Sequence, residues 1–412
     1  MKILQVSNLS DVLPKSFFKD KKLVSVQNNQ FTAAGENYGS SVISIVITLQ
    51  HDDSQEQEEI NTVAKLLPPN QFIRNFMNSS YTFRNELGFY QTILPTLRLF
   101  QKEQTSVETL DFFPKFLGGR LSLDSSARFP DDNAIILLEN LKDSGFELHD
   151  RHNGFDLEAT KLILKRVAEL HGVALALKTT PEFEQTLSLY FEEFRMFGGD
   201  DGLPMFQVLK NKVIKVLEED EFCRVHMDRI RLAIDVCTTN LLLPKNVAKF
   251  RQDTFATFIH SDLWINNIMV RKHQNKIEEV KFLDMQLCEY ASITKDLLFF
   301  LFTSVENSVL TQSFDQLLSF YYNELKENLE KMKCYRNEFS FDALKTEMRD
   351  VASNIGYFNI IRGMPAVFGA IDVVYEAEDL NRDRLLHQLE FSEVCKTRIC
   401  LITREFIHKR WI

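Results

Sequence analysis

The sequence predicts an α+β protein of two lobes, a small β-rich N-terminal lobe and a larger, mostly helical C-terminal lobe. Strand and helix patterns alternate up to about residue 138, and mainly helical patterns follow. Between them, the apolar run 134–139 indicates a buried strand that leads into a hinge. A chain of 412 residues is long enough to give each lobe its own core. We therefore expect lobes at 1–138 and 146–412, joined by a hinge at 139–145.

The first element is a glycine-containing turn at 35–41 that precedes a strongly apolar strand. Gly35 and Gly39 would let backbone N–H groups approach phosphate oxygens closely. Asn37 and Ser40 are the side chains of this turn that we expect to contact a bound nucleotide. A turn with this glycine spacing between two strands is also typical of an ordinary hairpin. It indicates a nucleotide site only because it precedes the next two elements in the chain.

The next two elements carry a lysine and a glutamate. Lys65 interrupts the apolar run 63–68, and a buried lysine needs an anionic partner. Glu86 lies on a predicted helix, beside its apolar face, and is the candidate partner. The alternatives are an edge-strand lysine that prevents aggregation and a solvated surface glutamate. The polar segment 101–107 that follows is predicted to be a loop.

The second lobe begins with a helix predicted over 157–177. His171 lies within it, and a lone histidine on an apolar face is more often a packed residue than a ligand. The charged segment 218–229 is predicted to be a linker between helices. A further helix is expected to start near the apolar run 297–302.

The most informative stretch is 258–270, with a second motif at 282–287. Asp262 and Asn267 stand five residues apart in a predicted loop, and Asp284 follows the strand of a hairpin. Phosphoryl transfer needs a group that takes the hydroxyl proton and oxygen ligands for magnesium, and these residues supply both. A His-x-Asp triplet alone is common by chance, and such residues often only cap turns. The combination points to a kinase active site.

Together these motifs resemble the ecdysteroid kinase-like family, a branch of the choline kinase and aminoglycoside phosphotransferase group with a protein-kinase-like fold. The resemblance covers about residues 35 to 300 in the expected order. It rests on Gly35-Glu-Asn-Tyr-Gly-Ser40, Val63-Ala-Lys-Leu-Leu-Pro68, Glu86-Leu-Gly-Phe-Tyr90, Leu138-Glu-Asn-Leu141, His260-Ser-Asp-Leu-Trp-Ile-Asn-Asn267, Leu283-Asp-Met-Gln-Leu-Cys288 and Lys295-Asp-Leu-Leu298.

The resemblance implies ATP and Mg²⁺ as cofactors and gives each motif residue a role. Lys65 would contact the nucleotide phosphates, braced by Glu86. Asp262 would be the catalytic base, and Asn267 and Asp284 would be the magnesium ligands.

Four further residues would support this site. Main-chain groups of Glu139 and Leu141 should meet the adenine edge at the hinge, by the same resemblance. His260 would buttress the catalytic loop, and Asp296 would hydrogen-bond back to it. Without the resemblance, Asp296 is explained by a helix start with this aspartate at or near the N-cap, so we predict that His260 and Asp296 are structural.

Three residues depart from the family pattern. Ser261 stands where glycine is usual, Met285 where phenylalanine is usual, and Ala64 alters the usual Val-Lys pair. None of these changes removes a functional group, although glycine at position 261 would offer backbone freedom that serine lacks.

The C-terminal third, 313–412, is expected to select the acceptor. The chain contains 35 phenylalanines, and aromatic residues at helical spacing usually belong to a core. The alternative is an apolar pocket roofed by rings, as a steroid or other flat lipophilic alcohol would need. Trp264, two residues past Asp262, is the ring we expect nearest the acceptor.

We therefore predict a kinase that phosphorylates a hydroxyl of a small apolar acceptor, an ecdysteroid or a xenobiotic alcohol or glycoside, for hormone inactivation or detoxification. A choline- or aminoglycoside-type kinase is the first alternative. A catalytically idle relative that binds a nucleotide or lipophile is the second, and the complete set of catalytic residues disfavours it.

The composition of the chain disfavours several other classes of protein. A net charge of −10 disfavours nucleic-acid binding, which needs clustered Lys and Arg. No run of eighteen apolar residues occurs, so we expect no membrane span. The six cysteines show no metal-ligand spacing, and the first ten residues lack a long apolar core. We expect a cytoplasmic protein with reduced thiols and no evident protein partner.

Overall fold

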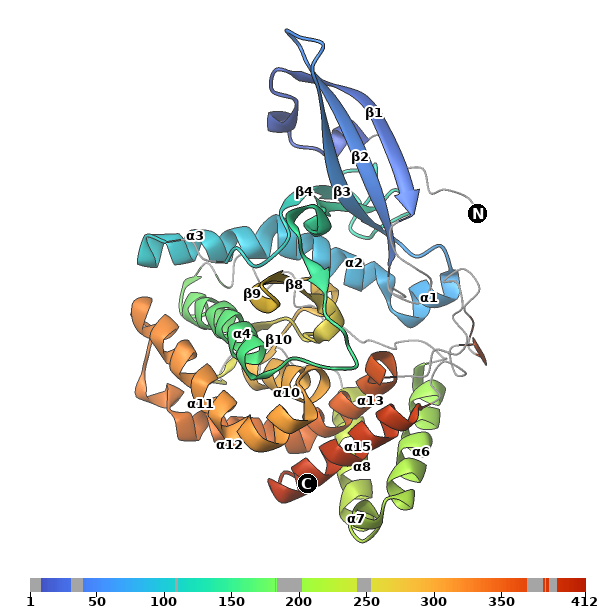
Figure 1. The fold of residues 1–412 in the computed structure, drawn as a ribbon, viewed down its shortest axis with the longest axis vertical. Helices are drawn as coiled ribbons and strands as arrows, with labels where there is room; N and C mark the ends of the chain where they lie inside the picture. Colours follow the sequence, from blue (N-terminus) through green and yellow to red (C-terminus); the bar gives the residue numbers. More distant parts are fainter. Residues whose placement is uncertain are drawn as a thin grey trace.

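An antiparallel sheet of five strands forms the small lobe (Figure 1). Its order is β1-β2-β3-β5-β4, with bounds Lys21–Gln30, Ser41–His51, Gln57–Leu66, Ile135–Glu139 and Phe116–Arg120 respectively. The computed structural model describes residues 9–30, 40–107, 110–181, 183, 202–242, 253–368, 381, 383–384 and 391–412. The predicted α+β architecture, with a small β-rich lobe and a larger, mostly helical lobe, is confirmed. The domain bounds remain a prediction.

The two faces of the sheet belong to different cores. Because side chains alternate along a strand, Ile135 and Leu137 of β5 join a small core with Ile45 and Leu9. Ile136 and Leu138 point the other way and join the core that fills the large lobe.

Helices of the first 138 residues pack on that second face. They are α1 (Gln71–Phe76), α2 (Ser79–Gly88), the π-helical η3 (Phe89–Ile93) and α3 (Leu94–Thr105). The predicted loop at 101–107 is wrong, because α3 continues to Thr105 and ends where Ser106 takes a left-handed conformation (φ 60°). The polar Gln101 is accommodated because it is buried and donates to Glu169 over 3.1 Å.

The segment that carries the catalytic motif forms short strands and turns. They are β7 (Ala256–Ile259), η6 (Ile265–Asn267), β8 (Ile268–His273), β9 (Lys276–Phe282), η7 (Met285–Leu287) and β10 (Glu289–Ser292). β8 and β9 pair antiparallel, which confirms the predicted hairpin. β8 also pairs with β6 (Glu147–Leu148), which follows the 3₁₀ turn η4 (Leu141–Ser144) after the hinge strand. β10 pairs with β7.

Helices make up the rest of the large lobe. They are α4 (Leu157–Leu177), α6 (Gly202–Glu219), α7 (Glu221–Arg224), α8 (Met227–Leu242), α10 (Ile293–Ser304), α11 (Asn307–Lys331), α12 (Phe341–Val351), α13 (Tyr357–Phe368) and α15 (Glu393–His408). The predicted linker at 218–229 is wrong, since this segment is mostly helical. Its charges lie on exposed helix faces, and Asp220 caps α7 by accepting from the Cys223 N–H.

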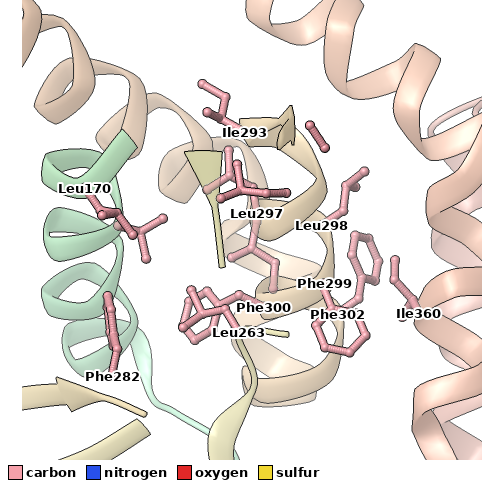
Figure 2. Close-up of a cluster of buried hydrophobic side chains, with 14 of the residues drawn as sticks. Leu170, Leu263, Phe282, Ile293, Leu297, Leu298, Phe299, Phe300, Phe302 and Ile360 are labelled. Carbon is pink, nitrogen blue, oxygen red and sulfur yellow. The ribbon is translucent and has the colours of Figure 1, made fainter. Parts of the chain in front are cut away.

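α10 is the central helix of the large core. Its apolar residues lie on every side, as expected of a helix surrounded by other elements, and almost all are buried. Figure 2 shows Leu297 and Phe300 between Leu170 of α4 and Ile360 of α13. Leu263 of the catalytic motif packs into the same cluster. Among the helices of the described ranges, none has both the length and the apolar character needed to cross a bilayer.

Candidate active site

The catalytic motif forms a loop between β7 and β8 that orients Asp262. The Asn267 Nδ2 donates to the Asp262 carboxylate over 3.1 Å and to its main-chain oxygen over 2.8 Å. The nearby Trp264 side chain also favours the charged form of the Asp262 carboxylate and so lowers its pKa. The spacing of five residues therefore closes a tight loop, as predicted.

Asp284 meets this loop from the end of β9. It adopts a left-handed conformation (φ 63°), and the preceding Leu283 N–H donates to the Asn267 carbonyl over 2.8 Å. Gln286 Nε2 donates to Asp284 Oδ2 over 3.2 Å. The turn after β9 and the catalytic loop are thus joined, and the oxygen-bearing side chains of Asn267 and Asp284 lie on the two joined segments.

Lys65 connects the sheet to both other parts of the site. Its Nζ lies 2.6 Å from Glu86 Oε2 and 2.8 Å from Asp284 Oδ1. The predicted ion pair with Glu86 is present. Burial alone would lower the pKa of Lys65, but Asp284 and Glu86 outweigh it and raise the pKa. The lysine therefore stays charged at the meeting point of β3, α2 and η7.

The pKa of Asp262 is raised toward neutral pH. Burial, and then the charge of Asp284, raise the pKa of Asp262 to about 7, against the opposing effect of Arg362. A carboxylate with such a pKa is suited to accept a proton near neutral pH. Carboxylate and amide oxygens are also the ligands that Mg²⁺ prefers, so the donor atoms of Asn267 and Asp284 fit this ion.

Asp296 holds the catalytic loop through its main chain. Its two carboxylate oxygens accept from the N–H groups of His260 (2.8 Å) and Ser261 (2.7 Å). Asp296 lies near the helix start, as predicted: Ser292 caps α10, and Asp296 is the fourth residue of the helix and fully buried. A carboxylate in that first turn is free to reach the neighbouring loop, and the hydrogen bonds to this loop, implied by the resemblance, are present.

Two histidines complete this support. His260 Nε2 lies 2.9 Å from the Leu283 carbonyl and ties the loop to the turn before Asp284. His171 of α4 lies 3.2 Å from Asp296 and 2.8 Å from the Tyr321 hydroxyl of α11. His171 is packed in the core, as predicted, but sequence reasoning missed its link to the loop because nothing near it in the chain indicates that contact.

Ser261 has the conformation that favours glycine (φ 66°). Its hydroxyl donates to Glu289 over 2.5 Å and accepts from Lys295 Nζ over 2.9 Å. Lys295 also forms an ion pair with Glu289. These hydrogen bonds offset the strain that a side chain adds in the left-handed region, so the departure from glycine is accommodated.

Arg362 of α13 also belongs to this site, and the sequence analysis did not select it. Its guanidinium donates to Asn359 over 2.7 Å, and its charge lowers the pKa of Asp262. Burial, and then the charge of Arg362, lower the pKa of Lys295 to about 8. The one available signal was a charged side chain inside the strongly apolar run 357–368.

The remaining predicted residues are placed as follows. The Glu139 N–H donates to the Lys115 carbonyl, and the Leu141 carbonyl accepts from the Phe146 N–H. An adenine edge would therefore have to use the Glu139 carbonyl or the Leu141 N–H. Ser40 is buried just before β2. Asn37 lies outside the described residues.

Comparisons with solved structures find distant likenesses. Among solved structures, a choline kinase from Cryptosporidium parvum Iowa II is 10% identical, with 94% of this chain and 91% of that chain covered and a TM-score of 0.42. A Plasmodium vivax ethanolamine kinase is 13% identical, with 94% and 84% covered and a TM-score of 0.41. A GDP complex of a mutant aminoglycoside 2'-phosphotransferase IIIa is 12% identical, with 98% and 97% covered and a TM-score of 0.38.

These likenesses are weak, and the family rests on a stronger match. No curated protein matches the chain. The model of the ecdysteroid kinase-like family matches residues 34–334, which include every described residue of the site except Arg362 and Asn359. The chain belongs to the ecdysteroid kinase-like family.

Proposed function

We propose that the protein is an ATP- and Mg²⁺-dependent kinase that phosphorylates a hydroxyl of a small apolar acceptor, an ecdysteroid or a xenobiotic alcohol or glycoside. One observation carries the proposal: Lys65 lies within 2.8 Å of both Glu86 and Asp284, so residues 219 positions apart meet beside the Asp262 loop. A structural ion pair alone would not need the second carboxylate, the half-buried Asp284. We propose that the enzyme acts in the cytoplasm, in detoxification or in the inactivation of a hormone.

Each residue of the site has a part in this proposal. Asn267 and Asp284 would hold Mg²⁺, which neutralises phosphate charge when bound. Lys65 would exchange its contact with Asp284 for a phosphate oxygen and keep Glu86 as its brace. Asp262 would orient the acceptor hydroxyl and take its proton at a carboxylate oxygen, held in place by Asn267.

The charges near Asp262 favour a neutral acceptor over a cationic one. The positive charge of Arg362 acts on Asp262, whereas the charge of Lys295 is balanced by its ion pair with Glu289. A choline-like or aminoglycoside-like acceptor would bring further positive charge to that position, and like charges repel strongly where water is scarce. This observation ranks the apolar alcohol above the cationic alternatives.

The direct test is an acceptor screen. The full chain is incubated with ATP and Mg²⁺ and with ecdysteroids, phenolic glycosides or amino alcohols, and products are read by mass spectrometry for the gain of a phosphate. We expect a phosphate on the steroid or glycoside hydroxyl. Phosphorylation of amino alcohols alone would reverse the ranking of acceptors, and Mg²⁺–ATP binding without turnover of any compound would favour the idle relative.

Trp264 is expected to contribute to acceptor binding. Trp264→Ala should raise the acceptor KM roughly tenfold to a hundredfold with little change in the KM for ATP, because a large apolar contact is lost. Trp264→Phe, which removes the indole N–H near Asp262 but keeps a ring, should preserve most of the acceptor affinity. Steady-state kinetics with both substrates varied would measure this.

Tryptophan fluorescence provides a second test of the proposed contact between Trp264 and the acceptor. The chain has two tryptophans, and Trp411 packs against Phe302 and Phe406. In a Trp411→Phe variant all indole emission comes from Trp264, and it should respond to the acceptor. An equal rise of both KM values in Trp264→Ala, with no fluorescence response, would place the acceptor elsewhere.

The pH dependence should report on Asp262. A base must be unprotonated, so kcat/KM for the acceptor should rise with pH through about 7 and be about tenfold below its plateau near pH 6. Arg362 lowers the pKa of Asp262, so Arg362→Ala should move this rise to higher pH, and Arg362→Lys should restore it. Arg349→Ala, at an exposed position on α12, is the matched control. An identical profile in Arg362→Ala and the wild type would show that the arginine does not act on the base.

A further inference from the structure

A cavity of about 490 Å³ lies at the end of the large lobe, between α6, α15 and the start of α11. Figure 1 places these helices at the opposite end of the molecule from strands β1–β3. Its walls carry charged and polar side chains, among them Glu219, Asn307, Lys396 and Arg404. Cys400 of α15 also lines the cavity and is partly exposed to it.

A second cysteine lies directly behind Cys400. Cys223, the third residue of α7, is fully buried. The two sulfurs and a carboxylate oxygen of Asp220 lie within 4.8 Å of one another. Residues 177 positions apart in sequence thus form a thiol pair with one accessible and one buried member.

The same three residues make a poor metal site. Asp220 already accepts from the Cys223 N–H over 2.9 Å and from Arg404 Nη2 over 2.5 Å. Structural zinc takes four ligands, usually thiolates and imidazoles, and the described residues supply two thiols here. The guanidinium of Arg404 on the third group further opposes a cation.

The environment favours a reactive thiol at Cys400. The neighbouring Cys223 thiol has the largest influence on the pKa of Cys400 and lowers it, and the charge of Arg404 acts in the same direction. Burial and the charge of Asp220 oppose this shift, and each has a smaller effect. Thiolate character and access together determine which cysteine reacts first.

We propose that Cys400 and Cys223 form a thiol oxidation site that a hydroperoxide converts to a disulfide between α15 and α7. The Cys400 thiolate attacks the peroxide, so that an S–O bond forms, the O–O bond breaks, and the departing oxygen leaves as water or an alcohol. The Cys223 thiol, on losing its proton, then attacks the sulfenic sulfur, so that an S–S bond forms and the S–O bond breaks with release of water. The two thiols lose two electrons, which the peroxide gains.

The other described cysteines lack this combination. Cys237, Cys288 and Cys395 are buried, and Cys334 is partly exposed. Among the described residues, Asp220, Cys223 and Cys400 form the only close group of three or more thiol, imidazole or carboxylate side chains. Cys334 is therefore the natural comparison, because it has similar exposure without a partner thiol in such a cluster.

The test treats the reduced full chain with a small excess of hydrogen peroxide, followed by alkylation, digestion and mass spectrometry. We expect a peptide pair joined through Cys223 and Cys400, lighter by two hydrogen atoms and separated again by dithiothreitol. Cys400→Ser should abolish the cross-link and leave Cys223 alkylated. Cys334→Ser should leave the cross-link unchanged. Circular dichroism checks the fold, and Cys400→Ala serves as a second variant.

Three results would overturn the proposal. The first is oxidation of Cys334 before Cys400. The second is a stable sulfenic acid on Cys400, trapped by dimedone, with no cross-link to Cys223. The third is stoichiometric binding of Zn²⁺ that protects both thiols from alkylation, which would make the cluster a metal site. None of these outcomes depends on kinase activity, so the proposed function is tested separately.

Discussion

Replacing Asp262 with asparagine is expected to lower kcat about a hundredfold or more while leaving Mg²⁺–ATP affinity nearly unchanged. The substitution removes the proton acceptor, which is worth about that factor. It keeps the size of the side chain and leaves Lys65 and Asp284 untouched, so the phosphate contacts should persist. Single-turnover kinetics and ATP titration of the variant would separate the two effects.

The matched control for this experiment is Asp315→Asn on α11, where the aspartate is exposed and distant in sequence from every residue of the site. It should behave as the wild type. If Asp262→Asn turns over acceptor at the normal rate, Asp262 is not the base. If it loses ATP binding as well, the residue acts on the nucleotide rather than on the hydroxyl.

Replacing Asp284 with alanine is expected to abolish Mg²⁺-dependent ATP binding and activity together. The variant loses the carboxylate proposed to link the ion to the phosphates, and Lys65 loses one of its two partners. A ligand present at a hundred times its Kd stabilises the folded state by about 2.7 kcal/mol. Differential scanning calorimetry should therefore show a rise in Tm with Mg²⁺–ATP for the wild type and none for Asp284→Ala.

Asp315→Ala again supplies the control, with an unchanged response to Mg²⁺–ATP. Normal stabilisation of Asp284→Ala by Mg²⁺–ATP would remove Asp284 from the set of metal ligands. Stabilisation by ATP that no longer depends on Mg²⁺ would instead show that the nucleotide binds through Lys65 and the hinge alone.

Local sequence pattern was sufficient for the parts of the site that depend on short spacing. A lysine inside an apolar run requires an anion, so the Lys65–Glu86 pair could be predicted before the structure was known. The Asp262–Asn267 loop and the hairpin to Asp284 follow from five- and seventeen-residue separations along one stretch of chain. The roles of these residues in catalysis remain predictions.

Contacts between distant helices could not be predicted in this way. Arg362 and His171 lie 100 and 91 positions from Asp262, and neither has a neighbour in sequence that indicates its partner. Polarity also misled the assignment at 101–107 and 218–229, because helices that lie on a surface carry polar faces and resemble loops in composition. Only the packing of α3 against α4, and of α7 against α15, reveals these segments as helices with a buried side.

The alternation along β5 has a consequence for how the molecule opens. Ile136 and Leu138 share a core with α2, α3 and the large lobe. Ile135 and Leu137 share a second core with β2 and Leu9. The two sides of this one strand therefore belong to different cooperative units. Amide hydrogens of β1 and β2 should then exchange with solvent through partial unfolding of the sheet. Those of α2, which carries Glu86, should exchange only when the large lobe unfolds.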